Sequence, residues 1–249
     1  MATMAVTPLS QFKGVLLDIE GTTTPISFVH DVLFPYARSH LQEHLSANWE
    51  PSDAALQALL GRADELLDEE ARSGNPQSVV VRVVHALMDR DEKYGPLKEL
   101  QGKIWRRGYD SGELFGLVFP DVLPAIRHWR SLQLRVCIYS SGSVSAQKLL
   151  FGHIEPSALL PGEDVLALFS GFFDTSVGSK VEAGSYLRIS QQLQLNPADI
   201  LFLTDRPVEA RAAQQAGVTA MIVTRLGNAV LTDEERSSWT VLSSFGQLE

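Results

Sequence analysis

The chain has 249 residues, of which 45% are hydrophobic and 20% are charged, an ordinary composition for a water-soluble globular protein. A formal net charge of −9 argues against nucleic acid or an anionic membrane as a partner, because both would require a basic face. No apolar run approaches the roughly 20 residues that span a bilayer, so we expect no transmembrane helix.

The chain begins with Met1–Pro8, which lacks the basic start and apolar stretch of a secretory signal, so we expect a cytoplasmic protein. The first predicted strand is the apolar run Val15–Leu17, and Asp18-Ile19-Glu20-Gly21 follows it directly. In an extended strand Asp18 and Glu20 would point in one direction, roughly 6.6 Å apart, with room for a phosphoryl group. The alternative is that both acids only cap a turn or helix.

Residues 27–115 differ from the rest of the chain because they show helical periodicity almost throughout. The predicted helices are Asp31–Leu45, Asp53–Ala71, Ser78–Arg90 and Leu97–Tyr109. A connection of this length is far longer than the usual link between two strands. We therefore predict a helical cap domain over residues 27–115, inserted into a core formed by residues 1–26 and 116–249 and acting as a lid.

The second predicted strand, Val136–Tyr139, contains the single cysteine, Cys137, which we expect to be a buried thiol without a catalytic role. One cysteine also excludes an intramolecular disulfide. Ser140, Ser141 and Ser143 follow this strand and precede a predicted helix. Hydroxyl and backbone N–H groups at a helix N-terminus form an anion site, although Ser143 could equally be an ordinary N-cap.

Lys180 opens a further predicted helix, Val181–Leu193. A cation at a helix N-terminus opposes the helix dipole, so a lysine there is a poor choice for stability and a natural one for holding a phosphate. The alternative is a solvated surface lysine.

The third predicted strand, Ile200–Leu203, is followed by a second acid, Asp205, and Glu209 comes one helical turn later. Magnesium prefers oxygen ligands and usually takes one or two carboxylates together with substrate phosphate and water. Asp18 and Asp205 suit this pattern. Glu209 is either a direct or water-mediated partner of the metal or an ordinary acid of a first helical turn.

Strands and helices alternate through the second half of the chain, where Ala220–Val223 is the last predicted strand. The helices predicted between and around these strands are Pro124–Leu132, Val144–Gly152, Val181–Leu193 and Val208–Ala216. This alternation predicts an α/β fold with a doubly wound, mostly parallel, Rossmann-like sheet. Ligands of such folds bind beyond the carboxyl ends of the strands, where the candidate residues stand.

Together these residues predict phosphoryl transfer. Asp18 is a carboxylate at neutral pH and can attack phosphorus without an activating base, forming a phosphoaspartate. Glu20 could protonate the leaving oxygen and then deprotonate the attacking water. A divalent cation and Lys180 would offset most of the negative charge of the phosphate, Asp18 and Asp205.

Other candidate groups are weaker. His40 and His44 form the only histidine pair at helical spacing and have no third ligand near them, so we predict no zinc site.

The ordered set Asp18 with Glu20, then Ser140, Lys180, and Asp205 with Glu209 resembles the four motifs of the haloacid dehalogenase superfamily. Glutamate at the second acidic position of residues 17–26 is similar to the enolase-phosphatase (acireductone synthase) family in particular. Residues 139–144, 146–153 and 173–175 resemble the same family. The likeness covers nearly the whole chain, is weakest over residues 48–95, and leaves Arg206 as a position of expected variation.

The resemblance implies a bifunctional enzyme of methionine salvage. Its substrate would be 2,3-diketo-5-methylthiopentyl-1-phosphate, which is enolised and then dephosphorylated to the acireductone 1,2-dihydroxy-3-keto-5-methylthiopentene. It implies one Mg²⁺ per chain, ligated through Asp18, Glu20 and Asp205, with Ser140, Ser141 and Lys180 holding the substrate. Glu20 could meet the metal through its backbone carbonyl, so its acid–base role and its metal role both stay open. The methylthio tail of this substrate would meet apolar residues of the cap, for which Trp105, Tyr109 and Phe28 are candidates, with plain core packing as the alternative. We expect a monomer.

The residues alone predict a phosphatase and do not identify the enolising base, for which Glu20 is the candidate. One alternative is a magnesium-dependent phosphatase of another small phosphate ester, without the enolase step. The other is a non-catalytic protein that binds a phosphorylated metabolite on the same fold.

Overall fold

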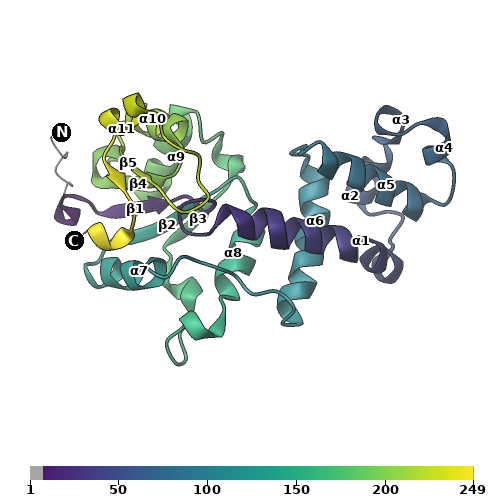
Figure 1. Cartoon of the computed structure of the whole chain (residues 1–249), viewed down its shortest axis with the longest axis horizontal. Coiled ribbons are helices and arrows are strands. Elements are labelled where there is room, and N and C mark those ends of the chain that lie inside the picture. Colours follow the sequence, from purple (N-terminus) through teal and green to yellow (C-terminus); the bar gives the residue numbers. More distant parts are fainter. Residues whose placement is uncertain (1–7, 249) are drawn as a thin grey trace. The chain divides into compact units, whose positions relative to one another are not determined.

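The computed structural model describes residues 8–248, which form two compact units (Figure 1). The core consists of the described residues up to Val29 and from Phe115 onward, and the helical unit is His30–Leu114. The division falls close to the boundaries predicted at residues 27 and 115. In the described part of the chain, no helix combines the length and the apolar character that crossing a membrane would need.

The core is built on a six-stranded sheet in which every neighbouring pair of strands is parallel. The spatial order is β3-β2-β1-β4-β5-β6. The strands are β1 Gly14–Leu17, β2 Arg135–Tyr139, β3 Gly171–Phe173, β4 Ile200–Thr204, β5 Thr219–Val223 and β6 Val241–Leu242. The predicted α/β fold with a doubly wound parallel sheet is confirmed.

The chain order reverses at β1, which pairs with β2 on one side and β4 on the other. This reversal creates a crevice outside the carboxyl end of β1, the usual ligand site of doubly wound sheets. β1 and β4 are buried along their whole length, as the continuous apolar runs predicted.

The sequence prediction missed β3 and β6, which have three and two residues. Strands this short carry no recognisable run of alternating or apolar residues. They exist because β2 and β5 offer a free edge with which a short extended segment can pair.

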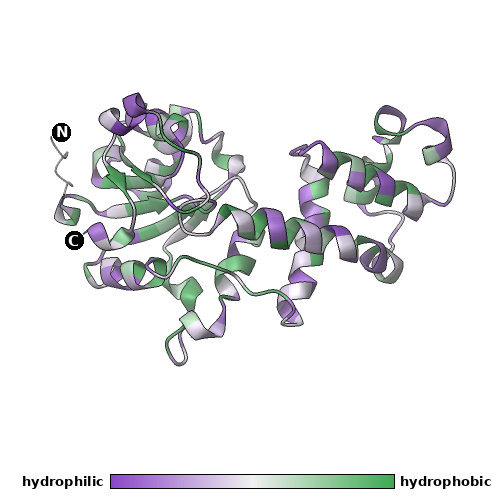
Figure 2. Cartoon of the chain, in the orientation of Figure 1, coloured by the Kyte–Doolittle hydropathy of each residue, from purple (hydrophilic) through white to green (hydrophobic). Residues whose placement is uncertain are grey.

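Helices cover both faces of the sheet. Figure 1 shows α9 Ala183–Leu193, α10 Pro207–Gln215 and α11 Asp233–Ser238 on one face, and α7 Val122–Ser131 and α8 Val144–Gly152 on the other. Apolar residues of α9 and α10, such as Tyr186 and Ala213, share one cluster with the sheet residues Leu16 and Phe202. In Figure 2 the strands are mostly hydrophobic in colour, whereas the helices carry hydrophilic residues between their apolar ones.

The helical unit contains α1 Phe34–Asn48, α2 Ala54–Leu60, α3 Ala63–Leu66, α4 Glu69–Arg72, α5 Pro76–Asp89 and α6 Gly95–Asp110. Its interior is a cluster of aliphatic side chains that includes Leu41, Val80, Val83, Leu87 and Ile104.

Two predictions for this unit were wrong in detail. The single helix predicted over 53–71 is three short helices, α2, α3 and α4. The second break has a local cause, because the carboxylate of Asp68 accepts the N–H of Ala71 and so starts α4 as a separate helix. α2 ends at Leu60, with Gly61 as its C-cap residue. The helix predicted from Asp31 begins as a π-helical turn, Phe28–Leu33, before α1.

Candidate active site

The predicted site residues gather at the carboxyl edge of the sheet. Asp18 follows β1, Ser140 follows β2, and Asp205 follows β4. The register pairs Leu17 of β1 with a residue on each neighbouring strand, which brings the three strand ends to the same level. Parallel pairing at the reversal point therefore joins segments that lie far apart in the sequence.

Asp18 is 5% exposed and its carboxylate is held by three donors. Oδ1 accepts the N–H of Ile19 at 2.7 Å and lies 2.5 Å from the Nζ of Lys180. Oδ2 accepts the hydroxyl of Thr204 at 3.2 Å. A carboxylate has about four lone-pair positions, so these contacts orient Asp18 and still leave capacity for a ligand.

Lys180 is buried and bridges two acids, with its Nζ 2.5 Å from Asp18 Oδ1 and 2.7 Å from Glu209 Oε2. Burial alone would lower the pKa of this ammonium, but the two carboxylates more than reverse that effect and raise the pKa. The hydroxyl of Tyr186 donates to the Lys180 carbonyl at 2.6 Å and fixes its backbone. The ammonium is thus held in its charged form at one position.

The prediction that Lys180 opens a helix and opposes the helix dipole was wrong, because α9 begins at Ala183 and not at residue 181. Lys180 lies in the turn before the helix and does not oppose its dipole. The alternative of a solvated surface lysine is also wrong, since the side chain is buried between Asp18 and Glu209.

Asp205 lies close to two other acids, Asp18 and Glu209. Burial, with further contributions from the carboxylates of Asp18 and Glu209, raises the pKa of Asp205 to about 7. Its Oδ1 is buried without a hydrogen-bond partner. The pKa of Glu209 is raised too, first by burial and then by Asp18. Glu209 is therefore more than a solvated first-turn acid, because it is buried and bonded to Lys180 and to the hydroxyl of Thr204.

The donor set fits a divalent cation on chemical grounds. The Lys180 ammonium contacts two of the three carboxylates, those of Asp18 and Glu209, and the buried Oδ1 of the third, Asp205, has no hydrogen-bond partner. Among the described residues, no three His, Cys, Asp or Glu side chains form a ready-made metal cage. Magnesium seldom uses such a cage, because it keeps several waters and binds through one or two carboxylates and substrate phosphate.

Ser140 is buried at the end of β2, and its Oγ accepts the N–H of Gly142 at 3.3 Å. The anion site predicted at the start of the next helix is already used by the protein itself. Asp174 accepts the N–H of Val144 at 3.0 Å, and Ser143 caps the helix by accepting the N–H of Ala146. The first turn of α8 is therefore already capped, and the Ser140–Gly142 segment before it is the candidate for holding an anion.

Glu20 is half-buried in a turn rather than on a strand. β1 ends at Leu17 and the chain bends at Ile19, so strand alternation, used to predict the spacing of Asp18 and Glu20, does not describe this segment. Glu20 instead forms an isolated bridge with Thr24.

Sequence reasoning missed Thr204, the buried last residue of β4. Its hydroxyl lies 2.9 Å from Glu209 Oε2 and 3.2 Å from Asp18 Oδ2, and it accepts the N–H of Arg206. A hydroxyl has a single proton, so it can donate to one of these two acids at a time. Only the register between β1 and β4 could have revealed this contact.

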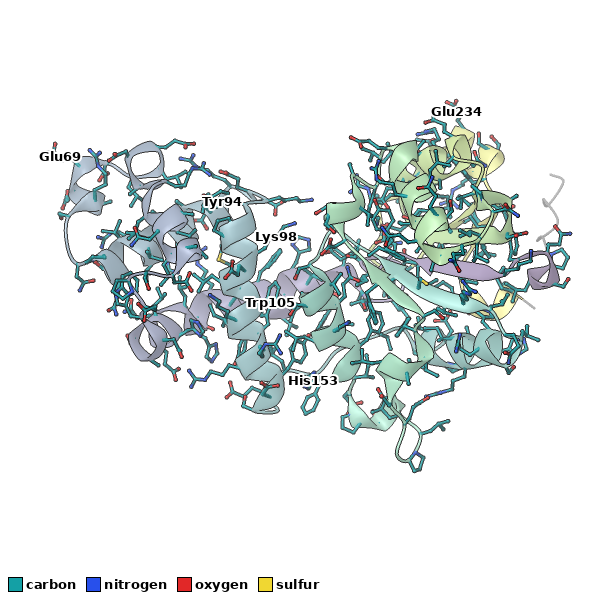
Figure 3. All side chains as sticks on the ribbon, turned by 180° about the vertical axis from the view of Figure 1, so that it is seen from behind. Glu69, Tyr94, Lys98, Trp105, His153 and Glu234 are labelled. Carbon is teal, nitrogen blue, oxygen red and sulfur yellow. The ribbon has the colours of Figure 1, made fainter. Side chains whose placement is uncertain are left out.

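The candidates for an apolar tail pocket are engaged in packing. Tyr109 and Phe28 are 4% and 5% exposed. The indole of Trp105, labelled on α6 in Figure 3, donates to the carbonyl of Leu33 at 2.7 Å and stacks on Phe34. Each of these three residues therefore packs within its own unit, which agrees with the alternative of plain core packing.

A model of the haloacid dehalogenase-like hydrolases matches residues 12–217. The enolase-phosphatase E1 of Salmo salar is 44% identical and the alignment covers 100% of this chain and 98% of that protein. The enolase-phosphatase E1 of Drosophila melanogaster is 46% identical, over 95% of this chain and 92% of that protein.

Solved structures are similar as well. The UTR4 protein of Saccharomyces cerevisiae superposes with a TM-score of 0.75 at 33% identity, over 95% of this chain and 100% of that chain. A predicted phosphoglycolate phosphatase of Haemophilus somnus gives a TM-score of 0.52 at 14% identity, over 94% of this chain and 95% of that one, which is a likeness of fold alone.

Proposed function

The chain belongs to the haloacid dehalogenase-like hydrolases and, within them, to the enolase-phosphatase E1 family, and on this premise we propose how its residues carry the reaction. The protein is an acireductone synthase of methionine salvage. It enolises 2,3-diketo-5-methylthiopentyl-1-phosphate and releases phosphate to give 1,2-dihydroxy-3-keto-5-methylthiopentene. The observation that carries the mechanism is the convergence of Lys180 and Thr204 on the carboxylate of Asp18.

Asp18 is the nucleophile in this proposal. One of its oxygens forms a bond to phosphorus while the bond between phosphorus and the ester oxygen breaks, and Glu20 gives that oxygen a proton. A water molecule then attacks the phosphorus of the phosphoaspartate and gives a proton to Glu20, the bond between phosphorus and the Asp18 oxygen breaks, and phosphate leaves. Lys180 holds negative charge on the phosphoryl oxygens through both steps, with its position fixed by Glu209.

Ser140 and Ser141 are the proposed phosphate contacts beside Lys180. The position of Ser140 at the end of β2, next to β1 in the sheet, supports this assignment. Glu20 is also the candidate base for the enolase step, in which a proton leaves the carbon next to a carbonyl. Either use requires a carboxyl placed within hydrogen-bond reach of the substrate.

Haloacid dehalogenase-like hydrolases generally use Mg²⁺, and we propose one ion per chain, held by Asp18 and Asp205 with Glu20 through its carboxylate or its carbonyl. When bound, the ion supplies positive charge that stabilises the phosphoryl oxygens and can polarise a carbonyl. We assign Glu209 to Lys180 and not to the ion, since Glu209 Oε2 already lies 2.7 Å from the ammonium, with the Thr204 hydroxyl at 2.9 Å. Action as a monomer in the cytoplasm stays a prediction.

Product analysis tests the function. The purified chain is given the diketone phosphate with and without magnesium, and both acireductone absorbance and released phosphate are followed. We expect the two products in equal amounts and only with the metal. Phosphate release from simple esters without any acireductone from the diketone phosphate would contradict the enolase assignment.

A further inference from the structure

We propose that Asn228 and Arg225, on the loop after β5, are positioning residues that hold the turn carrying Glu20 in its working place. This inference rests on the acid–base role of Glu20 in the proposed function. The turn, called the Glu20 turn here, comprises residues 19–24. In Figure 1 the loop between β5 and α11 can be followed back toward the segment after β1.

Inside the Glu20 turn, one backbone carbonyl accepts three of the hydrogen bonds. The carbonyl of Ile19 accepts the N–H groups of Thr22, Thr23 and Thr24 at 3.1, 2.9 and 2.9 Å. The N–H of Gly21 donates to the carbonyl of Thr24 at 2.8 Å. These bonds close the turn but do not anchor it to the rest of the core.

The anchors come from outside, because three consecutive carbonyls of the turn accept donors from distant segments. The amide of Asn228 donates to the Gly21 carbonyl at 2.8 Å. The Nε of Arg225 donates to the Thr22 carbonyl at 3.2 Å. The N–H of Phe119 donates to the Thr23 carbonyl at 2.9 Å. Two of the three anchors are side chains that lie more than 200 positions away.

The orientation of Asn228 is defined by its own contacts. Its Nδ2 donates both to the Gly21 carbonyl and to the Val223 carbonyl, at 2.8 and 3.3 Å. Both amide hydrogens are therefore used, and a flipped amide would place an oxygen against two carbonyls. Val223 ends β5, so this side chain ties the Glu20 turn to the rigid edge of the sheet.

Gly21 shows how little room the turn has. Its φ of +71° is in the left-handed region, and a Cβ there would lie 2.6 Å from Asp205 Oδ2 and 3.0 Å from Asn228 Oδ1. The backbone after Glu20 thus passes closely between the acid on β4's end and the anchoring amide. A displaced turn would move Glu20 relative to both Asp18 and Asp205.

Arg225 is itself held in a fixed position. Its side chain is 6% exposed, and its guanidinium lies over the rings of Phe119 and Phe245, at 4.6 and 4.9 Å. Its Nη1 pairs with both oxygens of Asp121, at 3.0 and 2.9 Å. A planar cation that contacts two aromatic rings and pairs with a carboxylate is a rigid donor, so its Nε defines where the Thr22 carbonyl must lie.

Anchoring of this kind matters for proton transfer, because a displacement of about 1 Å can cost on the order of 10²-fold in rate. Substrate binding by Lys180 and the Ser140 segment does not use these anchors. Loss of Asn228 should therefore lower kcat and leave KM close to its original value.

A double-mutant cycle with Glu20 tests the proposal. We expect Asn228→Ala to lower kcat about 10- to 10²-fold, with KM changed by less than about twofold. In a Glu20→Gln background, the same Asn228→Ala change should cost less than about twofold, because the group that it positions no longer transfers a proton. Asn196→Ala is the matched control, because it removes an exposed amide contact to Asp199 just before the amino end of β4, and it should change neither kcat nor KM.

Each outcome is decisive. If Asn228→Ala lowers kcat by the same factor in both backgrounds, the residue does not act through Glu20 and the inference is wrong, while the mechanism stands. If Glu20→Gln alone keeps the full rate, the proposed acid–base role fails first, and that single variant reveals it. Arg225→Lys, which keeps a cation for Asp121 but lacks the Nε donor, gives a second cycle should Asn228→Ala unfold in a thermal melt.

Discussion

The core and the helical unit bury different kinds of side chain. The core encloses charged and hydroxyl groups at one edge of its sheet, among them Asp18, Lys180, Thr204 and Glu209. Among the described residues of the helical unit, Gln101 is the only buried residue with a charged, amide or aliphatic hydroxyl side chain. The rest of that interior is aliphatic and aromatic.

The difference follows from what each interior must do. An apolar interior needs the right volume and pattern, and many residue combinations supply them. A buried ammonium between two carboxylates needs particular partners at particular distances, because an unpaired buried charge is costly. At the carboxyl edge of the core sheet, buried charged groups cost stability but hold the reactive side chains at fixed positions.

Replacement of the proposed nucleophile, Asp18, should give the largest difference between the two units. We expect Asp18→Asn to lower turnover by at least about 10⁴-fold while substrate binding largely survives, because an amide has the same shape but is a poor nucleophile. Steady-state assays and substrate titration measure the two effects. Asp89→Asn, the same change at an exposed ion pair of the helical unit, should leave turnover close to unchanged. Full activity in Asp18→Asn would remove the phosphoaspartate from the mechanism.

Removal of the buried ammonium should cost both stability and rate. We expect Lys180→Met to destabilise the protein by about 3 kcal/mol, because Asp18 and Glu209 then lose their buried counter-charge. Urea unfolding in the absence of metal measures the loss. Adding Glu209→Gln to this variant should recover part of it, since one of the two uncompensated acids is gone. A double variant less stable than Lys180→Met would contradict the account.

A cavity in the helical unit should cost a similar amount of stability by a different route. Leu87 is fully buried, so Leu87→Ala should lower the free energy of unfolding by about 3 kcal/mol through lost burial and an unfilled void. Unfolding in urea measures this, and Leu226→Ala, at a side chain that is 96% exposed, is the matched control. In contrast to Lys180→Met, no second polar substitution should restore the loss.

The smallest effect is a difference in pH dependence between the units. Burial and neighbouring acids raise the pKa of Asp205 to about 7, so the folded core binds a proton that the unfolded chain has released. Core stability should therefore fall as pH rises from about 4 to about 7. Burial lowers the pKa of His44 and His85, so the unfolded chain takes up protons that the folded helical unit does not. Stability of that unit should fall as pH drops below about 6.5.

Metal-free protein, unfolded in urea between pH 5 and pH 8, allows the two trends to be separated. Asp205→Asn should flatten the trend of the core, and the double change His44→Gln with His85→Gln should flatten that of the helical unit. The slope of the unfolding free energy against pH should then have opposite signs in Asp205→Asn and in the double histidine variant. Slopes of the same sign would show that the units do not differ in this way.

The sequence alone determined the longer strands, and it predicted the helical insertion and the acids and lysine of the candidate site. Apolar runs such as Val136–Tyr139 are long enough to be read as buried strands, and Asp18 and Asp205 stand directly after such runs. It also determined the family, because the motif residues keep their order and spacing. These features are local, so neighbouring residues suffice to recognise them.

Only the tertiary structure decided which groups meet. The contact of Thr204 with Asp18 depends on strand register, and the anchors from Asn228 and Arg225 to the Glu20 turn depend on where a loop some 200 residues away returns to the sheet. The strands β3 and β6 exist only as partners of β2 and β5. The physical reason is that hydrogen bonds and ion pairs act over a few ångströms in space, and the sequence records spacing along the chain but not the folding that closes those distances.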